Sequence, residues 1–304
     1  MKLAVQILAF NVDQFIEHTL LNAAPHVEKI YVVHPPRPWN YNPALRDSMT
    51  NPTTRPFLEA VVGRVRQVVG TACDIEIVES DWSREDETRN AILAMARTEG
   101  FDWMIVQDAD EFYTEEGWNI IRKSLLRLAH VDVVVTPWFN FWKSAEFLLL
   151  TDKKSLKDFN ACFAIRCASD AAFASARMPT ITRRILIDAP CYHYGYVMSD
   201  QDMELKISSW GHANQIRDRH RWMKLKWLNW NLDSKYLHPV VPTFWYQAIR
   251  FPLPQPEFAL NFMSYRPVAD QLTKIFSLDE FAYDTHAALK FKARQIREAT
   301  GARQ

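Results

Sequence analysis

The chain has 304 residues, 48% of them hydrophobic and 24% charged, which is typical of a soluble globular protein with one large domain or a domain plus an appendage. Its 36 basic and 36 acidic side chains cancel, so the whole chain has no charge that would attract nucleic acid or an anionic membrane. No apolar run reaches the about 18 residues of a membrane span, and the N-terminus leads into a strand rather than a signal peptide. We therefore expect a cytoplasmic protein whose 4 cysteines are reduced thiols.

Strands and helices alternate along the first 137 residues. Short apolar runs predict strands over residues 3–9, 29–34, 74–79, 101–107 and 131–137. Helical periodicity and capping residues predict helices over about residues 13–24, 57–69, 83–99 and 115–129, the third of them with a capping box that starts at Ser83. This alternation indicates right-handed crossovers and an α/β fold with a mostly parallel, Rossmann-like sheet flanked by helices.

Residues 35–56 form a proline-rich connection between two of these elements. A connection of this length is usually either a functional loop or disordered. Two interpretations stay open: a tolerated surface insertion, and a flap that covers a ligand.

Three acidic residues follow the strand predicted at 101–107. Asp108 and Asp110 flank a single residue, and Glu111 comes next. Ligands of open α/β sheets bind beyond the carboxyl ends of the strands, and carboxylates crowded there are costly unless a cation lies between them. We therefore predict that Asp108 and Asp110 bind a divalent metal, Mn or Mg, that bridges two phosphates. The alternative is a polar turn that closes the strand.

The regular alternation weakens after residue 137. Strands are predicted over residues 160–167 and 184–188, and an aromatic segment around His193 follows the second of them. Ser199 is expected to cap a helix that begins at Asp200. Residues 237–267 are predicted to form an irregular wrap, and residues 279–300 a final helix.

Four segments together resemble a known enzyme family. They are the first strand with Asn11-Val12-Asp13, then Thr88-Arg89-Asn90, Gln107-Asp108-Ala109-Asp110-Glu111-Phe112, and Gln201-Asp202-Met203-Glu204-Leu205. Over about residues 1–235 the chain resembles nucleotide-sugar glycosyltransferases of the GT-A fold, close to the family 2 type, with its DxD motif. Three features depart from that family. Gln201 stands where it usually has Glu, no Gln-x-x-Arg-Trp segment follows, and Tyr192-His193-Tyr194-Gly195-Tyr196 is not typical of its best-known members.

The resemblance implies a GT-A domain over residues 1–235, divided into a donor- and metal-binding half (1–137) and an acceptor-side half (138–235), with a C-terminal wrap and helix over 236–304. It implies transfer of a hexosyl or pentosyl group from a nucleotide-sugar donor to an acceptor hydroxyl, with inversion and with Asp202 as the general base. The donor-binding residues that it implies are Asn11, Asp13, Arg89, Asn90 and Asp108. The acceptor stays open among a glycan, a protein side chain and a modified nucleic-acid base.

Two of the candidate side chains have structural alternatives. Arg89, close to the start of its helix, is expected near the surface with its charge toward the donor, or else in an i,i+4 pair with Glu85. His193 is predicted to be a third metal ligand, because imidazole suits Mn better than Mg, or else a core histidine.

The acceptor-side acids also have alternatives. Asp202 lies at a helix N-terminus, where it either takes the proton of the acceptor or pairs with Ser199 as part of a cap. Asp200 is the second candidate for the catalytic carboxylate, and Glu204 a third. Residues 217–226 interleave cations with tryptophans, which fits either a solvated helix with Trp on its buried face or a site for a phosphorylated acceptor or nucleic acid.

Two other functions compete with the glycosyltransferase. A non-catalytic sugar-nucleotide or glycan-binding module has the same fold, because a fold alone does not establish chemistry. A nucleotidyltransferase shares the alternating core, but it is expected to have a glycine-rich phosphate loop after the first strand, and residues 9–12 contain no glycine.

Overall fold

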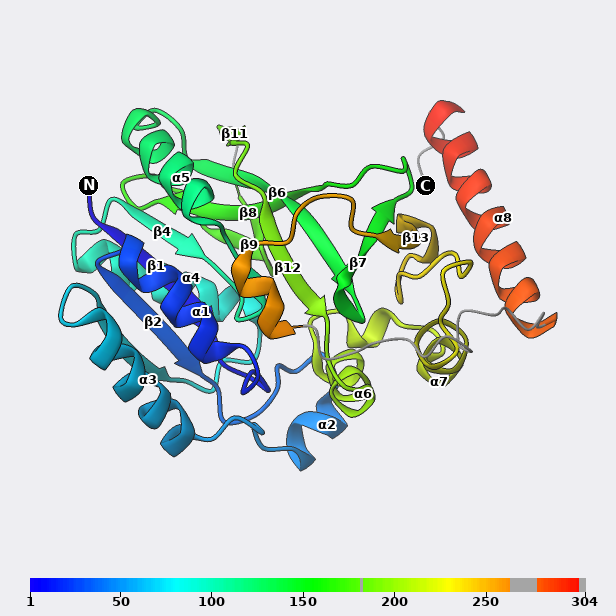
Figure 1. Ribbon diagram of the computed structural model, residues 1–304, viewed down its shortest axis with the longest axis horizontal. Coiled ribbons are helices and arrows are strands. Elements are labelled where there is room, and N and C mark those ends of the chain that lie inside the picture. The colour runs from blue at the N-terminus through cyan, green and yellow to red at the C-terminus, as the bar shows by residue number, and fades with distance from the viewer. Residues whose placement is uncertain (181–182, 263–277, 301–304) are drawn as a thin grey trace. The chain divides into compact units, whose positions relative to one another are not determined.

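Four parallel strands form the centre of the first of two structural units. They are β1 (Leu3–Leu8), β2 (Lys29–His34), β3 (Asp74–Glu79) and β4 (Trp103–Val106), arranged side by side in the order β3-β2-β1-β4. The connecting helices are α1 (Ile16–Ala23), α3 (Arg55–Val69) and α4 (Glu85–Thr98), and α5 (Glu115–Arg127) follows the fourth strand (Figure 1). The computed structural model describes residues 1–180, 183–262 and 278–300.

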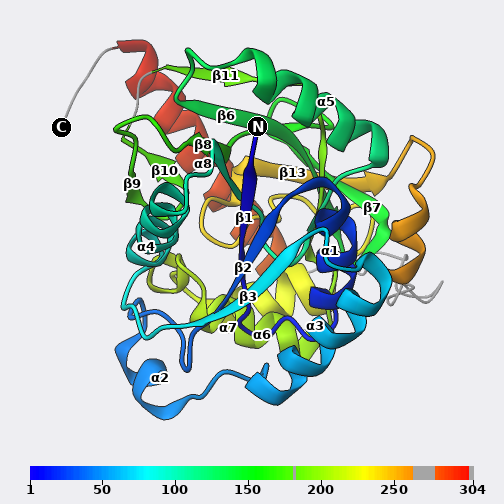
Figure 2. The ribbon, with the colours of Figure 1, turned by 90° about the vertical axis from the view of Figure 1, so that its left-hand side faces the viewer.

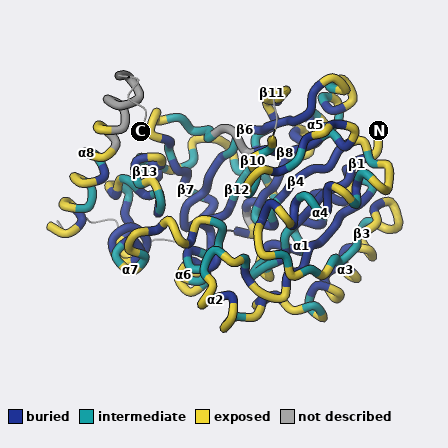
Figure 3. Tube along the Cα trace, turned by 180° about the vertical axis from the view of Figure 1, so that it is seen from behind, coloured by how far each residue is buried: buried dark blue, intermediate teal, exposed yellow. Residues whose placement is uncertain are grey.

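Helices cover both faces of these strands. Figure 2 shows α1 and α3 on one side of the parallel strands and α4 on the other. Ile92 and Leu93 of α4 belong to one buried cluster with Val33 of β2 and Val106 of β4. Strands covered on both sides have to be almost continuously apolar, and β1, β2 and β4 are almost entirely buried. β3, at the edge of the sheet, is only partly buried and alternates polar with apolar residues. In Figure 3 the central strands are buried and the outer faces of the helices are exposed.

Antiparallel strands extend the parallel core. Strand β8 (Asp158–Arg166) pairs with β4, and the first part of β6 (Val133–Trp142) pairs with β8. The remaining strands of unit 1 are β5 (Glu111–Phe112), β9 (Phe173–Ser175), β10 (Met178–Pro179), β11 (Arg184–Leu186) and all but the last residue of β12 (Cys191–Tyr196). The prediction of a mostly parallel α/β sheet flanked by helices, of the Rossmann-like GT-A type, is thus confirmed.

The connection at residues 35–56 is more ordered than the sequence indicated. It contains a short helix, α2 (Pro43–Ser48), and its last residues begin α3. The Asn51 amide donates to the carbonyls of Ala9 (2.7 Å) and Pro35 (2.8 Å), and it accepts from the N–H groups of Asn11 (3.2 Å) and Thr53 (3.0 Å). The connection is therefore fastened to the ends of β1 and β2.

The second unit contains residues 140–157, 196–207 and 215–304, of which 263–277 and 301–304 lie outside the described residues. Its strands are the end of β6, β7 (Ser144–Thr151) and β13 (Trp245–Arg250), which pair antiparallel in that order from β6. Its helices are α6 (Asp200–Ser209, which ends in unit 1), α7 (Arg219–Trp222) with a π-helical continuation (Met223–Leu228), and α8 (Leu278–Thr300). Short 3-10 turns at Ala24–His26, Ala213–Gln215, Pro242–Phe244 and Glu257–Phe262 complete the described elements of the two units.

Strand β13 lies inside the segment that the sequence indicated to be irregular, and residues 263–267 of that segment lie outside the described residues. The tryptophans of the basic tract, Trp222, Trp227 and Trp230, are buried. Lys226 is also buried, and its ammonium group pairs with Glu280 (3.0 Å) and Asp284 (2.6 Å) of α8. Trp222 and Trp227 lie on the buried face of α7 and its π-helical continuation, which agrees with the first of the two interpretations of this tract.

The four cysteine thiols are buried and free. Among the described helices, none combines the length and the apolar character needed to cross a membrane. The cytoplasmic location and the division at residue 235 stay predictions.

Candidate functional site

The strand order creates a switch point between β1 and β4. From β1 the chain steps outward to β2 and β3, and then returns to place β4 on the other side of β1. Ligands of open α/β sheets bind in the crevice at the carboxyl ends of the two strands that flank such a point. Asp108 and Asp110 follow β4 there, and Asn11 and Asp13 follow β1, so the topology brings two of the predicted segments to one edge.

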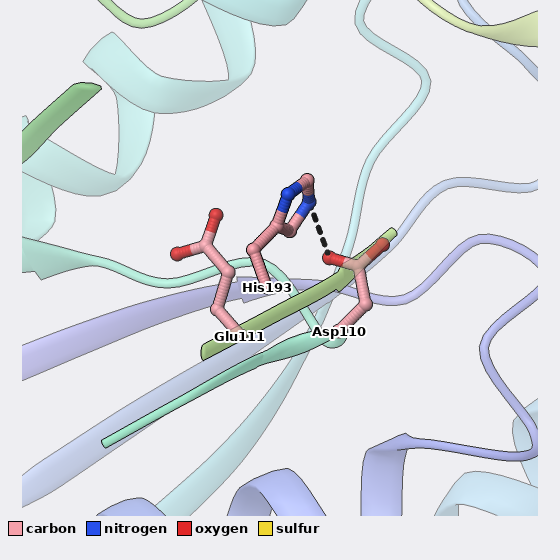
Figure 4. Close-up of side chains that lie close together, drawn as sticks. All are labelled: Asp110, Glu111 and His193. Atoms are coloured by element: carbon pink, nitrogen blue, oxygen red, sulfur yellow. Dashed lines mark ion pairs between the residues drawn. The ribbon is translucent and has the colours of Figure 1, made fainter. Parts of the chain in front are cut away.

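A short antiparallel pair places His193 beside the acids. His193 of β12 lies directly opposite Glu111 of β5, and the Tyr194 N–H donates to the Asp110 carbonyl (2.8 Å). Residues directly opposite each other in an antiparallel pair project from the same face. The His193 Nε2 is 3.5 Å from Oδ1 of Asp110, and the ring and the carboxylate face each other in Figure 4. The possible ligand atoms of Asp110, Glu111 and His193 all lie within 4.8 Å of one another.

Asp108 is held between two arginines. Its Oδ1 is 3.2 Å from Nη2 of Arg89, and its Oδ2 is 3.2 Å from Nη1 of Arg177. Burial raises the pKa of Asp108, but the guanidinium groups of Arg177 and Arg89 outweigh it and hold that pKa below its usual range. The carboxylate is therefore a fixed negative charge, and both of its oxygens already have cationic partners.

The sequence did not indicate Arg177, which lies in the turn between β9 and β10 and contacts the acidic residues of the site. Its guanidinium makes a close bidentate pair with Glu111, which has no exposed side-chain surface. Burial raises the pKa of Glu111 to about 7 even though the Arg177 charge lowers it. No local pattern marks Arg177, because its partner lies 66 residues away in the chain.

Arg89 corrects one expectation from the sequence. Its side chain is 3% exposed, so it is buried rather than near the surface. It makes the i,i+4 pair with Glu85 (2.5 Å) that the second interpretation described, and it also contacts Asp108. Its role toward a donor stays a prediction. These bonds use Nε and Nη2, and none of the described residues accepts a hydrogen bond from its Nη1. Donor capacity is therefore left for a ligand.

Asn11, Asp13 and Asn90, the other residues implied for donor binding, form hydrogen bonds within the protein. Both ends of the Asn90 amide bond to the backbone of Phe173 (2.8 and 2.9 Å), which fastens α4 to β9. Asn11 has a left-handed backbone (φ 53°), and its N–H bonds to Asn51. The Asp13 carboxylate accepts from the Thr53 hydroxyl (2.5 Å). The contacts of Asn11 and Asp13 fix the backbone at the end of β1. A donor-binding role for the three residues stays a prediction.

The two acceptor-side acids belong to unit 2 and have different surroundings. The Ser199 hydroxyl donates to Oδ2 of Asp202 (2.6 Å) and accepts from the Asp202 N–H (3.1 Å), which is the cap that the sequence offered as the alternative to a base. Oδ1 of Asp200 accepts from the Trp227 indole N–H (2.7 Å) and lies 3.4 Å from Nζ of Lys143. The Asp200 side chain is 57% exposed, so it is both anchored and accessible.

Ligand chemistry and geometry fit a divalent metal at Asp110 and His193. At metal–ligand distances of about 2.1 Å, two ligand atoms on one ion are at most about 4.2 Å apart. The 3.5 Å between Asp110 and His193 is within that limit, whereas a set that includes Glu111 reaches 4.8 Å. Carboxylate and imidazole together suit transition metals such as Mn. The sequence prediction of Asp110 and His193 as ligands thus has a geometric basis, while Asp108 contacts arginines.

No protein-family model matches the sequence, and no curated protein matches it. Among solved structures, S. aureus TarS aligns over 75% of this chain at 13% identity and TM-score 0.38, and this chain spans 43% of that protein. HddC from Yersinia pseudotuberculosis aligns over 63% of this chain and 93% of its own, at 10% identity and TM-score 0.37. A 4-diphosphocytidyl-2C-methyl-D-erythritol synthase from Anaerococcus prevotii aligns over 62% and 87%, at 12% identity and TM-score 0.32. Likenesses this low carry no argument about function, so the site itself has to supply it.

Proposed function

We propose that this protein is a metal-dependent glycosyltransferase that moves a sugar from a nucleotide-sugar donor to an acceptor hydroxyl. The observation that carries the proposal is the pairing of Asp110 with His193 (3.5 Å) beside Asp108 at the carboxyl edge of β4, next to the switch point of the sheet. Negative charge develops on a nucleoside diphosphate as it leaves. Positive groups that are already fixed at this edge of the sheet would stabilise that charge without having to reorganise.

The chain's own residues have distinct roles in this proposal. Asp110 and His193 would hold Mn or Mg, and a bound divalent cation would act as a Lewis acid that stabilises the charge of the departing diphosphate. Arg89 would meet a phosphate oxygen with its remaining donors, since its other N–H groups bond to Glu85 and Asp108. Asp108 would orient Arg89 rather than bind the donor through a free carboxylate.

For the acceptor we propose an inverting reaction in which Asp202 takes the proton of the attacking hydroxyl, with Asp200 as the alternative. The resemblance supports Asp202, whereas its mutual bonds with Ser199 favour a capping role. Asp202→Asn should lower transfer at least about 10²-fold and leave donor binding intact if Asp202 is the base. Loss of transfer on Asp200→Asn alone would assign the role to Asp200, and a product of retained configuration would remove the need for either.

The decisive experiment is donor turnover by the purified protein with a panel of nucleotide sugars, with and without Mn. We expect Mn-dependent release of nucleoside diphosphate that Asp110→Asn abolishes without changing the fold. Asp102→Asn is the matched control, because Asp102 precedes β4 at the opposite end of the strand and is exposed. Binding without turnover would indicate a sugar-nucleotide-binding module. Formation of nucleoside triphosphate and sugar 1-phosphate when pyrophosphate is added would indicate a nucleotidyltransferase.

A further inference from the structure

Arg177 uses all of its hydrogen-bonding capacity inside the protein. Its Nη1 bonds to carboxylate oxygens of Asp108 (3.2 Å) and Glu111, and its Nη2 bonds to Glu111 (3.2 Å) and the Val106 carbonyl (2.7 Å). Its Nε donates to the Cys162 carbonyl (3.3 Å). A guanidinium has five N–H donors, and these are five bonds. Arg177 therefore has no donor left for a substrate, in contrast to Arg89.

The surroundings fix the guanidinium in this place. Its centre is 4.9 Å from the centroid of the Trp138 ring, and the His193 ring lies 4.5 Å from the same tryptophan. A cation over an indole face is favourable, most of all where water is excluded. Ala176, the residue before it, has a left-handed backbone (φ 40°), which costs an alanine about 1–2 kcal/mol. The turn is thus held in an unfavourable conformation that directs Arg177 inward.

Glu111 is the side chain most affected by this arrangement. It is fully buried, adjacent to Asp110 in sequence and opposite His193 in the β5–β12 pair. Its possible ligand atom lies within 4.8 Å of those of the other two residues, so a small side-chain shift would let it join them around one ion. Both of its oxygens, however, already bond to Arg177. A carboxylate in a bidentate arginine pair has its strongest acceptor sites occupied.

We propose that Arg177 is a positioning residue that withholds Glu111 from the metal, so that Asp110 and His193 are the protein ligands and the remaining coordination positions stay open for the donor diphosphate. This inference rests on the proposed metal site. A site with few protein ligands leaves positions for substrate phosphates, as hard divalent cations in phosphoryl-group enzymes require. Arg177 then determines which side chains bind the metal, although it does not itself contact the donor.

The test is the affinity for Mn alone, measured by isothermal titration calorimetry without any donor. Arg177→Met should tighten Mn binding at least about 10-fold, because it releases the Glu111 carboxylate as a third protein ligand. A purely structural role predicts weaker binding, since the site would lose order. Arg89→Met is the matched control. Arg89 contacts Asp108 but not Glu111, so this change removes the same charge beside Asp108 without releasing Glu111. It should change Mn affinity by less than about 3-fold.

A double variant keeps the test valid if Arg177→Met does not fold. Arg177→Met with Glu111→Gln replaces the buried ion pair by neutral side chains, a change that proteins often tolerate. Its Mn affinity should stay within about 3-fold of the wild type if Glu111 is withheld, and a loss of 10-fold or more would overturn the inference. So would an Arg177→Met protein that binds Mn no more tightly than Arg89→Met.

These outcomes separate the two proposals. A wild-type protein that binds no Mn contradicts the metal assignment, whereas appearance of Mn binding in Arg177→Met would still support the inference. Absence of Mn binding in both proteins would overturn the inference as well.

Discussion

At the scale of single residues, Arg89 shows how one side chain serves both stability and binding. Its guanidinium is 3% exposed and lies between Glu85 and Asp108, and Glu85 is itself only 11% exposed. Removal of one partner from a buried pair leaves an uncompensated charge, which costs more than the pair contributes. Any measurement of Arg89 in donor binding therefore has to be separated from its effect on folding.

We predict that Arg89→Ala lowers the free energy of unfolding by about 3 kcal/mol and weakens donor binding at least about 10-fold. Urea unfolding and calorimetry of the donor measure the two effects separately. Arg89→Lys keeps the charge, but one ammonium group cannot reproduce the planar fork, so donor affinity should stay low while part of the stability returns. Arg84→Ala, an exposed arginine at the start of the same helix, is the control and should change neither quantity measurably. Unchanged donor affinity in Arg89→Ala would restrict Arg89 to a structural role.

Lys143 is a buried cation whose protonation should be visible in stability. Its ammonium group stacks on the Trp227 ring (3.8 Å) and lies 3.4 Å from Asp200. Burial lowers the pKa of Lys143 to about 8 from an ordinary 10.5, and the Asp200 charge offsets only part of that effect. Because the unfolded chain binds the proton more tightly, protonation favours unfolding. The contribution to stability is full above pH 10.5 and is lost as the pH falls through 8.

We therefore predict that the unfolding free energy of the wild type rises between pH 8 and 10.5 relative to Lys143→Met. The shift from 10.5 to about 8 corresponds to about 3 kcal/mol, so Lys143→Met should be more stable than the wild type by about 1–3 kcal/mol at pH 7. Urea unfolding at pH 7 and pH 10 measures the difference. Lys224→Met, an exposed lysine of the same unit, should change stability by less than about 0.5 kcal/mol at both pH values. A Lys143→Met protein less stable than the wild type at pH 7 would contradict the assignment.

At the scale of elements, Asn51 and Thr53 fasten the connection at residues 35–56. The Asn51 amide bonds to Ala9, Asn11 and Pro35 at the ends of β1 and β2. Thr53 accepts from the Val12 N–H (2.9 Å) and from Nε2 of His34 (2.8 Å). A flap over a ligand would have to move while this point stays fixed.

Asn51→Ala should lower the free energy of unfolding by about 2–4 kcal/mol, because it leaves buried backbone groups unpaired. Limited proteolysis should show new cleavage within residues 35–54. Asn42→Ala provides the comparison, since Asn42 caps α2 and makes one bond to the Ser208 carbonyl, and it should cost about 1 kcal/mol. Equal effects of the two changes would mean that Asn51 is not the anchor.

The elements also show which parts of the site the sequence could predict. An apolar run followed by Asp108 and Asp110 defines a strand and its end, so local pattern alone was sufficient for them. His193 was found in the same way, from a strand in an aromatic segment. The contacts of Arg177 with Glu111 and Trp138 join three segments far apart in the chain, and no periodicity encodes them.

The N-cap of α4 lies one residue later in the structure than the sequence predicted. The Glu87 carboxylate accepts from the N–H groups of both Ser83 (3.1 Å) and Arg84 (3.2 Å), so the helix is capped at Arg84 and not at Ser83 as the sequence indicated. The predicted capping box placed the acid three positions after the cap at Asp86, whereas the structure uses Glu87, and Asp86 pairs with the Arg84 side chain.

At the scale of the whole molecule, the chain divides into two units, and the proposed metal ligands and Arg89 all belong to the first. A ligand that binds only the native state stabilises the unit that binds it. If the two units melt separately, a donor bound together with Mn should raise the melting temperature of unit 1. The proposed phosphate contacts of the donor belong to unit 1, so they should leave the melting temperature of unit 2 unchanged. Thermal unfolding therefore tests both the ligand and its location.

We predict that nucleotide sugars with Mn raise the melting temperature and that free sugars do not. At a ligand concentration of 100 times Kd the added stability is about 2.7 kcal/mol, or about 5 °C for a chain of this size. Asp110→Asn should remove the increment due to Mn, because it takes away half of the proposed ligand pair, while Asp200→Asn in unit 2 should retain it. Differential scanning fluorimetry over UDP-, GDP-, CDP- and ADP-sugars measures these shifts and identifies the nucleotide. Equal shifts for the wild type and Asp110→Asn, or shifts that do not depend on Mn, would contradict a metal-dependent donor site.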